Sequence, residues 1–207
     1  MNTFLAGGIV LCGGKSSRMG RPKAWLPFGP EVLLQRIVRI LDAVVGPLVV
    51  VAAPDQELPA LPDHVLVTRD ELPGRGPLEG LSAGLHALPE STTVAYLSAC
   101  DVPFLNDPFI NKLISDLGDA DIAVPFADGH YHPLAAVYRT SIISQVDRLL
   151  NQDRLRPFFL FDKVNTVRIS ETQLRKVDPE LDCLQNLNQL SDYHLALEKF
   201  HSLTDPG

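Results

Sequence analysis

Short runs of apolar, mainly β-branched residues alternate with helical patterns through most of this 207-residue chain. Such alternation is typical of strands that are buried on both faces and connected by helices, as in largely parallel sheets. Seven segments fit buried strands, at residues 8–12, 48–53, 65–68, 94–99, 122–125, 135–138 and 164–169. The sequence therefore predicts a three-layer α/β fold with helices on both faces of a central sheet.

Helical patterns fill the intervals between these segments. Apolar side chains recur with helical spacing over residues 32–41, after the turn residues Gly29 and Pro30. Four more helices are predicted, one after Gly76-Pro77 and three at residues 108–117, 141–150 and 191–200, the last with Ser191 as its N-cap. The turn pair Asp128-Gly129 predicts that the following strand runs antiparallel, so the mostly parallel sheet is expected to be mixed.

The length suits one domain, residues 1–207, with a core over about residues 6–198 and a frayed tail at residues 201–207. The chain has 25 acidic and 18 basic residues, which give a formal net charge of −7. This balance excludes general electrostatic binding of nucleic acid or anionic membranes, so neither is an expected partner. Basic residues are expected to act locally.

The three cysteines, Cys12, Cys100 and Cys183, are an odd number without close pairs. They therefore indicate neither a disulfide framework nor a zinc site, and they favour a reducing, cytoplasmic location. The longest apolar runs, such as residues 48–53, reach about a third of the roughly 20 residues that a membrane helix needs. No membrane association is expected.

Residues 11–23 follow the first predicted strand and contain three glycines and four basic residues. Glycines let the backbone approach an anion closely, and successive N–H groups with nearby Arg and Lys neutralise phosphate charge. The spacing fits neither common phosphate motif, because Ile9 occupies the place of the first Walker A glycine and G-x-G-x-x-G is not matched. The loop is predicted to bind polyphosphate, with a solvated glycine-rich turn as the alternative.

Asp101 ends another apolar segment, and Pro103 stops the run. Ligands of open α/β sheets bind outside the carboxyl ends of the strands, and Mg²⁺ takes one or two carboxylates together with phosphate oxygens. Asp101 is therefore a candidate Mg²⁺ ligand, with a turn or capping role as the alternative. Asp70 lies similarly after the third strand, and the glycines of residues 74–80 suit close contact with a planar ligand such as a nucleobase.

The chain resembles the molybdenum cofactor guanylyltransferases in five ordered elements: GGKSSRMGRPK, GRGPLEGLSAGL, ACDVPFL, HPLAAVY and NLNQLSDY. The first and third elements are shared with many nucleotidyltransferases, whereas the others point to the guanylyl branch. The resemblance covers about residues 6–198 and implies a Rossmann-like nucleotidyltransferase fold. It also implies transfer of GMP from GTP to molybdenum-molybdopterin, which releases pyrophosphate and forms the guanine dinucleotide cofactor.

The resemblance further implies Mg²⁺ as the metal cofactor, held by Asp101, and GTP, molybdenum-molybdopterin and molybdoenzyme-maturation proteins as partners. Catalytic roles fall on Arg18, Lys23 and Asp101. The implied nucleotide-binding and cofactor-binding residues are Leu11, Cys12, Gly13, Gly14, Arg18, Lys23, Asp70, Gly76, Gly80, Asp101, Asn186 and Asn188. Asn186 and Asn188 are expected near the reacting phosphates or the pterin. Phosphoryl-type transfer depends on positioning and charge stabilisation, so neither a covalent intermediate nor a general base is expected.

The chain departs from the family pattern at three places. Cys12 replaces an alanine, residues 51–54 lack an asparagine that the family often has, and Glu79 occupies the place of a small residue. The Glu79 carboxylate could accept hydrogen bonds from guanine or face solvent from the first turn of a helix, and solvent is the preferred interpretation. These departures concern the choice of base more than the reaction.

Several other residues have two interpretations. His130 and His132 form a turn rather than a metal site, with His132 on the pterin side by family resemblance, and Cys100 is expected to pack as a small hydrophobe. Arg154 and Arg156 are surface bases or a clamp for the molybdopterin phosphate. The remaining candidates are core aromatics or a platform for stacking a pterin: Phe158, Phe159 and Phe161.

Two alternative functions stay open. The first keeps the enzyme class and changes the substrates, to cytidylyl transfer to molybdopterin or to nucleotidyl transfer to another small phosphorylated acceptor. The second is a nucleotide-binding protein that delivers cofactor without catalysing transfer. The presence of both Lys23 and Asp101 argues against a pure binder, which has less need of a cation and a metal ligand placed for the phosphates.

Overall fold

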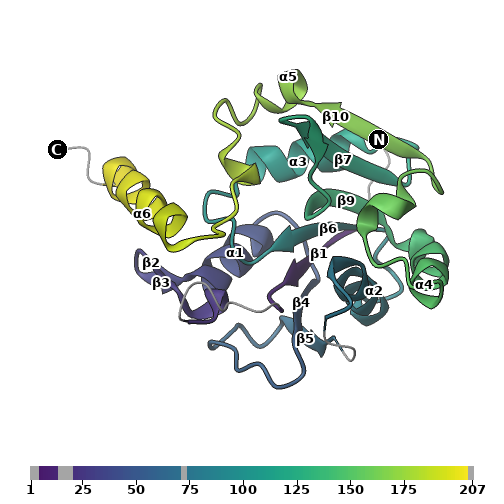
Figure 1. Cartoon of the computed structure of the whole chain (residues 1–207), viewed down its shortest axis with the longest axis horizontal. Coiled ribbons are helices and arrows are strands. Elements are labelled where there is room, and N and C mark those ends of the chain that lie inside the picture. Colours follow the sequence, from purple (N-terminus) through teal and green to yellow (C-terminus); the bar gives the residue numbers. More distant parts are fainter. Residues whose placement is uncertain (1–4, 14–20, 71–73, 205–207) are drawn as a thin grey trace.

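The computed structural model describes residues 5–13, 21–70 and 74–204, and a central sheet crosses it (Figure 1). Eight strands of the described residues form this sheet: β1 (Ala6–Leu11), β4 (Leu48–Ala52), β5 (Leu66–Arg69), β6 (Val94–Ala99), β7 (Ile122–Ala127), β8 (His130–Tyr131), β9 (Ala135–Arg139) and β10 (Thr166–Ser170). Their order is β10-β7-β9-β6-β1-β4-β5, and β8 pairs with β7. All seven predicted strands are present.

The sheet is mixed, as the turn pair Asp128-Gly129 predicts. Strand β1 runs parallel to both β4 and β6, β4 runs parallel to β5, and β10 runs parallel to β7. Strand β9 runs antiparallel to both β6 and β7, and the short β8 runs antiparallel to β7. Since β9 lies between β6 and β7, these two strands share one direction, and their carboxyl ends lie at the same edge as that of β1.

Helices cover both faces of the sheet, because successive side chains of the central strands are apolar on both sides. Helices α1 (Leu33–Asp42) and α3 (Asp107–Asp116) pack on one face, and α2 (Pro77–Ala87) and α4 (Ile143–Asn151) pack on the other. In β6, Tyr96 belongs to the first core and its neighbours Ala95 and Leu97 belong to the second. This period of two is the alternation of a strand buried on both faces.

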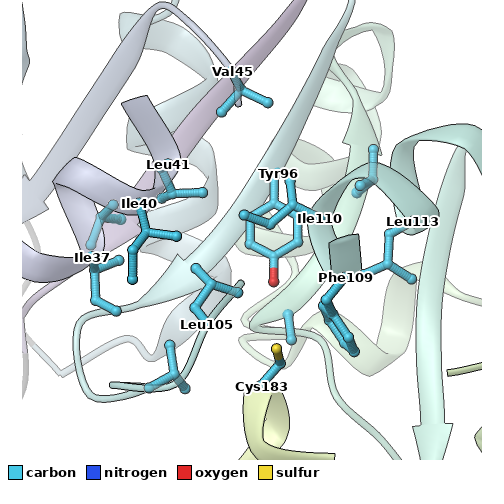
Figure 2. Packing of buried hydrophobic residues seen from close by; sticks show 14 of the residues in the cluster. Ile37, Ile40, Leu41, Val45, Tyr96, Leu105, Phe109, Ile110, Leu113 and Cys183 are labelled. Atoms are coloured by element: carbon cyan, nitrogen blue, oxygen red, sulfur yellow. The ribbon is translucent and has the colours of Figure 1, made fainter. Parts of the chain in front are cut away.

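Tyr96 lies at the centre of the core on the α1 and α3 face. Figure 2 shows this ring between labelled residues of the two helices: Ile37, Ile40 and Leu41 on one side, and Phe109, Ile110 and Leu113 on the other. The Tyr96 side chain is 1% exposed, and burial raises the pKa of its hydroxyl far above the ordinary value. Cys183 lies in the same core, so a segment close to the C-terminus completes it.

A smaller core forms beside the sheet. The hairpin of β2 (Pro27–Phe28) and β3 (Glu31–Val32) packs against α6 (Leu190–Thr204), which Figure 1 shows near this hairpin. Phe28 is fully buried there, and its ring centroid lies 5.0 Å from that of Phe200. The two-residue strands are too short for sequence periodicity to reveal, so this hairpin was not predicted.

Helix α6 corrects two expectations. The helix begins at Leu190 instead of after a Ser191 cap, because the Asp192 carboxylate accepts hydrogen bonds from the backbone N–H groups of Asn188 and Gln189, at 2.9 and 2.8 Å. The predicted frayed tail from His201 is also wrong in part, since α6 continues through Thr204.

The remaining described helices are short. They are α5 (Glu171–Leu174) and the 3₁₀ helices at Lys23–Trp25, Thr140–Ile142, Pro157–Leu160 and Asp182–Leu184. Across the described residues, none of the helices combines the length and apolar character that crossing a bilayer demands.

Candidate active site

Successive strands are added on one side of β1 first and on its other side later. One connection from β1 passes through α1 to β4, and a later one passes through α2 to β6 on the other side of β1. The two connections cover opposite faces of the sheet, so β1 and β6 form a topological switch point, with both carboxyl ends at the same edge. Ligands of open α/β sheets bind at such a switch point. Cys12 and Gly13 at the start of the glycine-rich loop follow β1 and Asp101 follows β6, so both lie at this edge, whereas residues 14–20 of the loop are outside the described residues.

The Asp101 carboxylate is the meeting point of three segments that are distant in sequence. Its Oδ2 atom lies 2.5 Å from Nζ of Lys23, which begins a 3₁₀ helix after the glycine-rich loop. Its Oδ1 atom accepts a hydrogen bond of 2.8 Å from Nδ2 of Asn186. The backbone N–H of Leu187 also donates to the Asp101 carbonyl, at 3.0 Å. The structure therefore joins Lys23, Asp101 and Asn186, which the sequence had assigned separately.

The pair of charges lies largely out of solvent. The Asp101 side chain is 10% exposed and that of Lys23 is 22% exposed. Removing charges from water is costly unless they are paired and hydrogen-bonded, and here both conditions hold. Each carboxylate oxygen keeps a free lone-pair direction after one bond, so the group can still accept a further ligand.

Asp101 also provides the carboxylate ligand that a magnesium site shared with a substrate needs. Mg²⁺ is bound by one or two carboxylates, with phosphate oxygens and waters in the remaining positions. Across residues 5–13, 21–70 and 74–204, His, Cys, Asp and Glu side chains form no group of three or more that could hold a metal without a substrate. A single buried carboxylate therefore fits Mg²⁺ only together with a bound phosphate.

Gln56 fixes the beginning of the glycine-rich loop. Its Nε2 atom donates to the Cys12 carbonyl at 2.9 Å, and its Oε1 atom accepts from the Ala53 N–H at 3.1 Å. Arg69 braces the same turn, since Nη1 donates to the carbonyls of Ala53 and Gln56 at 2.7 and 3.1 Å. The sequence did not predict a role for either residue, and the one feature that could have indicated it is the polar turn after β4. Gln56 thus supplies an amide in the region where the family asparagine is absent.

The Cys12 thiol faces the core. It donates to the Val51 carbonyl at 3.3 Å, and burial raises its pKa to about 12, so the thiol is neutral. Cys100 is buried as expected, and burial raises its pKa far above the ordinary value. Both cysteines pack as small apolar side chains, and only the backbone of Cys12 borders the loop.

Gly80 allows α2 to approach β1 closely. A Cβ atom at Gly80 would lie 2.9 Å from Cδ2 of Leu11, a separation too short for two carbon atoms. Gly76, the N-cap of α2, has a φ of +80°, which favours glycine. Gly13 is exposed two residues after the end of β1, and Asp70 directly follows β5, where its N–H donates to the Ala52 carbonyl.

The other predicted site residues divide into three groups. Arg18 and Gly14 lie outside the described residues. Asn188 is exposed on the turn before α6, and its backbone N–H donates to the Asp192 carboxylate, not to Asp101. His132 packs beside His130, with ring centroids 4.3 Å apart, and burial lowers its pKa.

The three phenylalanines at positions 158, 159 and 161 lie in different environments. Phe159 and Phe161 are partly buried against the core on the α2 and α4 face, as expected for core residues. Phe158 is 51% exposed, so the core interpretation is wrong for this ring. The Arg154 guanidinium lies over the Phe159 ring, 5.1 Å from its centroid.

Glu79 does not face solvent, which corrects the preferred expectation. Its carboxylate is 18% exposed, and Oε2 lies 3.1 Å from Nε of Arg75 one turn earlier. Arg75 therefore replaces part of the water around this carboxylate. The i, i+4 spacing of the two charges in the sequence already favours such an ion pair.

Comparisons with known proteins agree with this fold. A family model for the MobA-like NTP transferase domain matches residues 8–166. A probable molybdenum cofactor guanylyltransferase of Mycobacterium bovis (strain BCG / Pasteur 1173P2) is 38% identical, over 95% of this chain and 96% of the relative. One from Mycobacterium avium (strain 104) is 36% identical, over 89% and 91%.

Solved structures share the fold. The molybdopterin-guanine dinucleotide biosynthesis protein A of Archaeoglobus fulgidus aligns with a TM-score of 0.76 and 22% identity, over 93% of this chain and 97% of that one. Rv0371C of Mycobacterium tuberculosis, solved as a complex with manganese, aligns with a TM-score of 0.62 and 16% identity, over 93% and 98%. The matches define the Rossmann-like α/β fold of a nucleotidyltransferase. The chain belongs to the MobA-like NTP transferase family.

Proposed function

We propose that this protein transfers GMP from GTP to the terminal phosphate of molybdenum-molybdopterin, which forms the guanine dinucleotide cofactor and releases pyrophosphate. The similarity to probable molybdenum cofactor guanylyltransferases, at 38% and 36% identity, supports this substrate pair. The observation that carries the proposal is the cluster of Lys23, Asp101 and Asn186 at the sheet's switch point. To hold a triphosphate together with its metal ion, an enzyme needs a cation that binds the phosphates and a carboxylate that binds the metal.

The reaction needs charge stabilisation more than it needs a nucleophilic side chain. An oxygen of the acceptor phosphate attacks the α-phosphorus of GTP, and the bond from the α-phosphorus to the bridging oxygen breaks as pyrophosphate leaves. Lys23 neutralises charge that develops at the α-phosphate, and Arg18 binds the leaving pyrophosphate. No covalent intermediate is needed, because catalysis depends on positioning and charge stabilisation, and no general base is needed, because the acceptor phosphate is already ionised.

Asp101 would hold Mg²⁺, which supplies neutralisation of the triphosphate charge. Asn186 orients the Asp101 carboxylate through its hydrogen bond to Oδ1. In the described arrangement the Lys23 ammonium compensates the charge of this buried carboxylate. When phosphates enter the site, the same ammonium can share its three donors between the carboxylate and phosphate oxygens.

The nucleotide would contact several backbone segments. Residues Leu11, Cys12, Gly13 and Gly14 would line the guanosine, with Gln56 holding the start of this loop. Asp70 and the residues from Gly76 to Gly80 would lie on the side of the base and ribose, and Asn188 on the side of the pterin. We further propose cytoplasmic action with Mg²⁺, with molybdoenzyme-maturation proteins as partners and without nucleic acid or a membrane.

Calorimetric titration tests the nucleotide half of the proposal. GTP, CTP, ATP and UTP are titrated with Mg²⁺ into the wild-type protein and into Asp101→Ala. The proposal expects preferential binding of GTP, which weakens in the variant because the metal ligand is missing. Preference for CTP would replace the guanylyl product by a cytidylyl product, and no binding of any nucleotide would leave only a non-catalytic role.

A further inference from the structure

The carboxylate of Glu79 is already engaged at the N-terminus of α2. It occupies the first turn of this helix, its side chain is 18% exposed, and Oε2 lies 3.1 Å from Nε of Arg75. An acidic group in the first turn is also favoured by the helix dipole. A base placed beside this helix would therefore meet a carboxylate whose charge is paired.

Arg75 connects this turn to the end of another helix. Its Nη2 atom donates to the Leu150 carbonyl in the last turn of α4, at 2.7 Å, and Nη1 lies 3.8 Å from Oδ1 of the exposed Asp153. The last carbonyls of a helix have no partner within the helix and favour a cation. The guanidinium thus joins two groups in fixed positions, Glu79 on α2 and the carboxyl end of α4.

The backbone around Arg75 has little rigidity of its own. Gly74 has a φ of +89° and Gly76 has a φ of +80°, so glycines with wide conformational freedom flank Arg75 on both sides. A Cβ atom at Gly76 would lie 3.4 Å from the Leu155 carbonyl oxygen, an ordinary van der Waals separation, so the turn lies beside the segment after α4. The position of the turn therefore depends on the side-chain contacts of Arg75.

We infer that Arg75 and Glu79 are positioning residues that set nucleotide-base selectivity through the backbone of residues 74–78, without contact between Glu79 and the base. This inference rests on the proposed function, which places the base at this turn. The N–H and carbonyl groups of such a turn can distinguish the hydrogen-bonding edges of bases only while their positions are fixed. The Arg75 contacts with Glu79 and with the Leu150 carbonyl provide that fixation, and their loss broadens base choice.

The test compares binding of GTP, ATP, CTP and UTP to wild type, Arg75→Ala, Glu79→Ala, the double variant and Glu79→Gln, with Mg²⁺ present. The measured quantity is the ratio of dissociation constants between the preferred base and the others. Asp153→Asn is the matched control, because it changes the exposed neighbour of the same guanidinium. Circular dichroism confirms folding of each variant, and kcat and KM are measured in parallel.

The inference predicts that Arg75→Ala and Glu79→Ala each reduce selectivity by about tenfold, through KM rather than kcat, as expected for loss of one charge-assisted hydrogen bond. The double variant should be no worse than either single one. Glu79→Gln should stay within about threefold of wild type, because the amide oxygen still accepts from Arg75. Asp153→Asn should leave selectivity unchanged.

Two results overturn the inference. Loss of selectivity in Glu79→Gln, with Arg75→Ala like wild type, would show that the Glu79 carboxylate reads the base directly. Additive losses in the double variant would show that the two residues act separately. Absence of nucleotide binding in wild type removes the proposed function and the inference with it, whereas selective binding in both wild type and Arg75→Ala removes the inference alone.

Discussion

The Nζ atom of Lys23 lies 2.5 Å from Oδ2 of Asp101, although 78 positions separate the two residues in sequence. Lys23 follows the glycine-rich loop and Asp101 follows β6, so the contact links the two segments at the switch point of the sheet. The pair therefore couples the phosphate side of the proposed site to the proposed metal ligand.

Loss of either partner should stop the reaction without unfolding the protein. In Lys23→Ala and Asp101→Ala we expect turnover to fall by about 10²–10³-fold or more, as is typical when a charge-stabilising group is removed. Steady-state kinetics measures the effect, and circular dichroism checks the fold. Lys163→Ala, which removes an exposed lysine elsewhere, is the matched control. Full activity in both site variants would show that these residues do not act on the phosphates.

Asn186 should matter as an amide and not merely for its size. The Asn186→Asp variant places a second carboxylate against Oδ1 of Asp101, where an N–H donor now lies at 2.8 Å. Repulsion between the two charges should lower both thermal stability and kcat more than Asn186→Ala does. Thermal denaturation and kinetics of the two variants provide the measurement. An equal effect of the two substitutions would contradict a role for this amide in holding Asp101.

Gly84 should be intolerant of any side chain. A Cβ atom there would lie 2.5 Å from Cγ2 of Ile9, which is fully buried in β1. Although alanine favours helices more than glycine does, overpacking typically costs about 1–3 kcal/mol, so Gly84→Ala should destabilise the protein overall. Chemical denaturation measures the change. Recovery of stability in Gly84→Ala/Ile9→Ala, relative to Ile9→Ala alone, would confirm the steric origin, and a more stable Gly84→Ala would refute it.

His132 should make stability depend on pH in the weakly acidic range. Burial, with a smaller effect from neighbouring His130, lowers its pKa from the ordinary 6.5. The unfolded chain therefore binds a proton near pH 6.5 while the folded protein does not, so the free energy of unfolding falls as pH decreases below about 6.5. NMR titration should give a His132 midpoint below 6.5. The His132→Gln variant should show a weaker pH dependence, and an unchanged profile would contradict the assignment.

Local pattern was sufficient to predict seven strands of the sheet and its mixed direction, but neither the strand order nor the two-residue β8. The central strands are apolar on both faces, so their sequences identify buried strands, and Asp128-Gly129 identifies the turn that reverses direction. The position of Asp101 at a carboxyl end follows from the same pattern. The short hairpin of residues 27–32 could not be predicted, because its strands have two residues each.

The contacts within the site needed three-dimensional information. Asn186 contacts Asp101 although 85 positions separate them, and Gln56 contacts Cys12 although 44 positions separate them. No local sequence pattern in these segments predicts either contact. Glu79 is different, because its partner Arg75 lies four residues away and the spacing alone favours an ion pair. The start of α6 was misplaced because Ser191 and Asp192 are both capping residue types, and only the geometry distinguishes them.

The most direct test is a turnover assay with purified protein, Mg²⁺, molybdenum-molybdopterin and each of the four nucleoside triphosphates in turn. Mass spectrometry identifies the dinucleotide product, and pyrophosphate is quantified in the same reactions. Our account predicts the guanine dinucleotide from GTP, with one pyrophosphate released per product and no product from Asp101→Ala. Intact GTP and unmodified molybdopterin after incubation, with the wild-type protein folded and GTP bound, would contradict it.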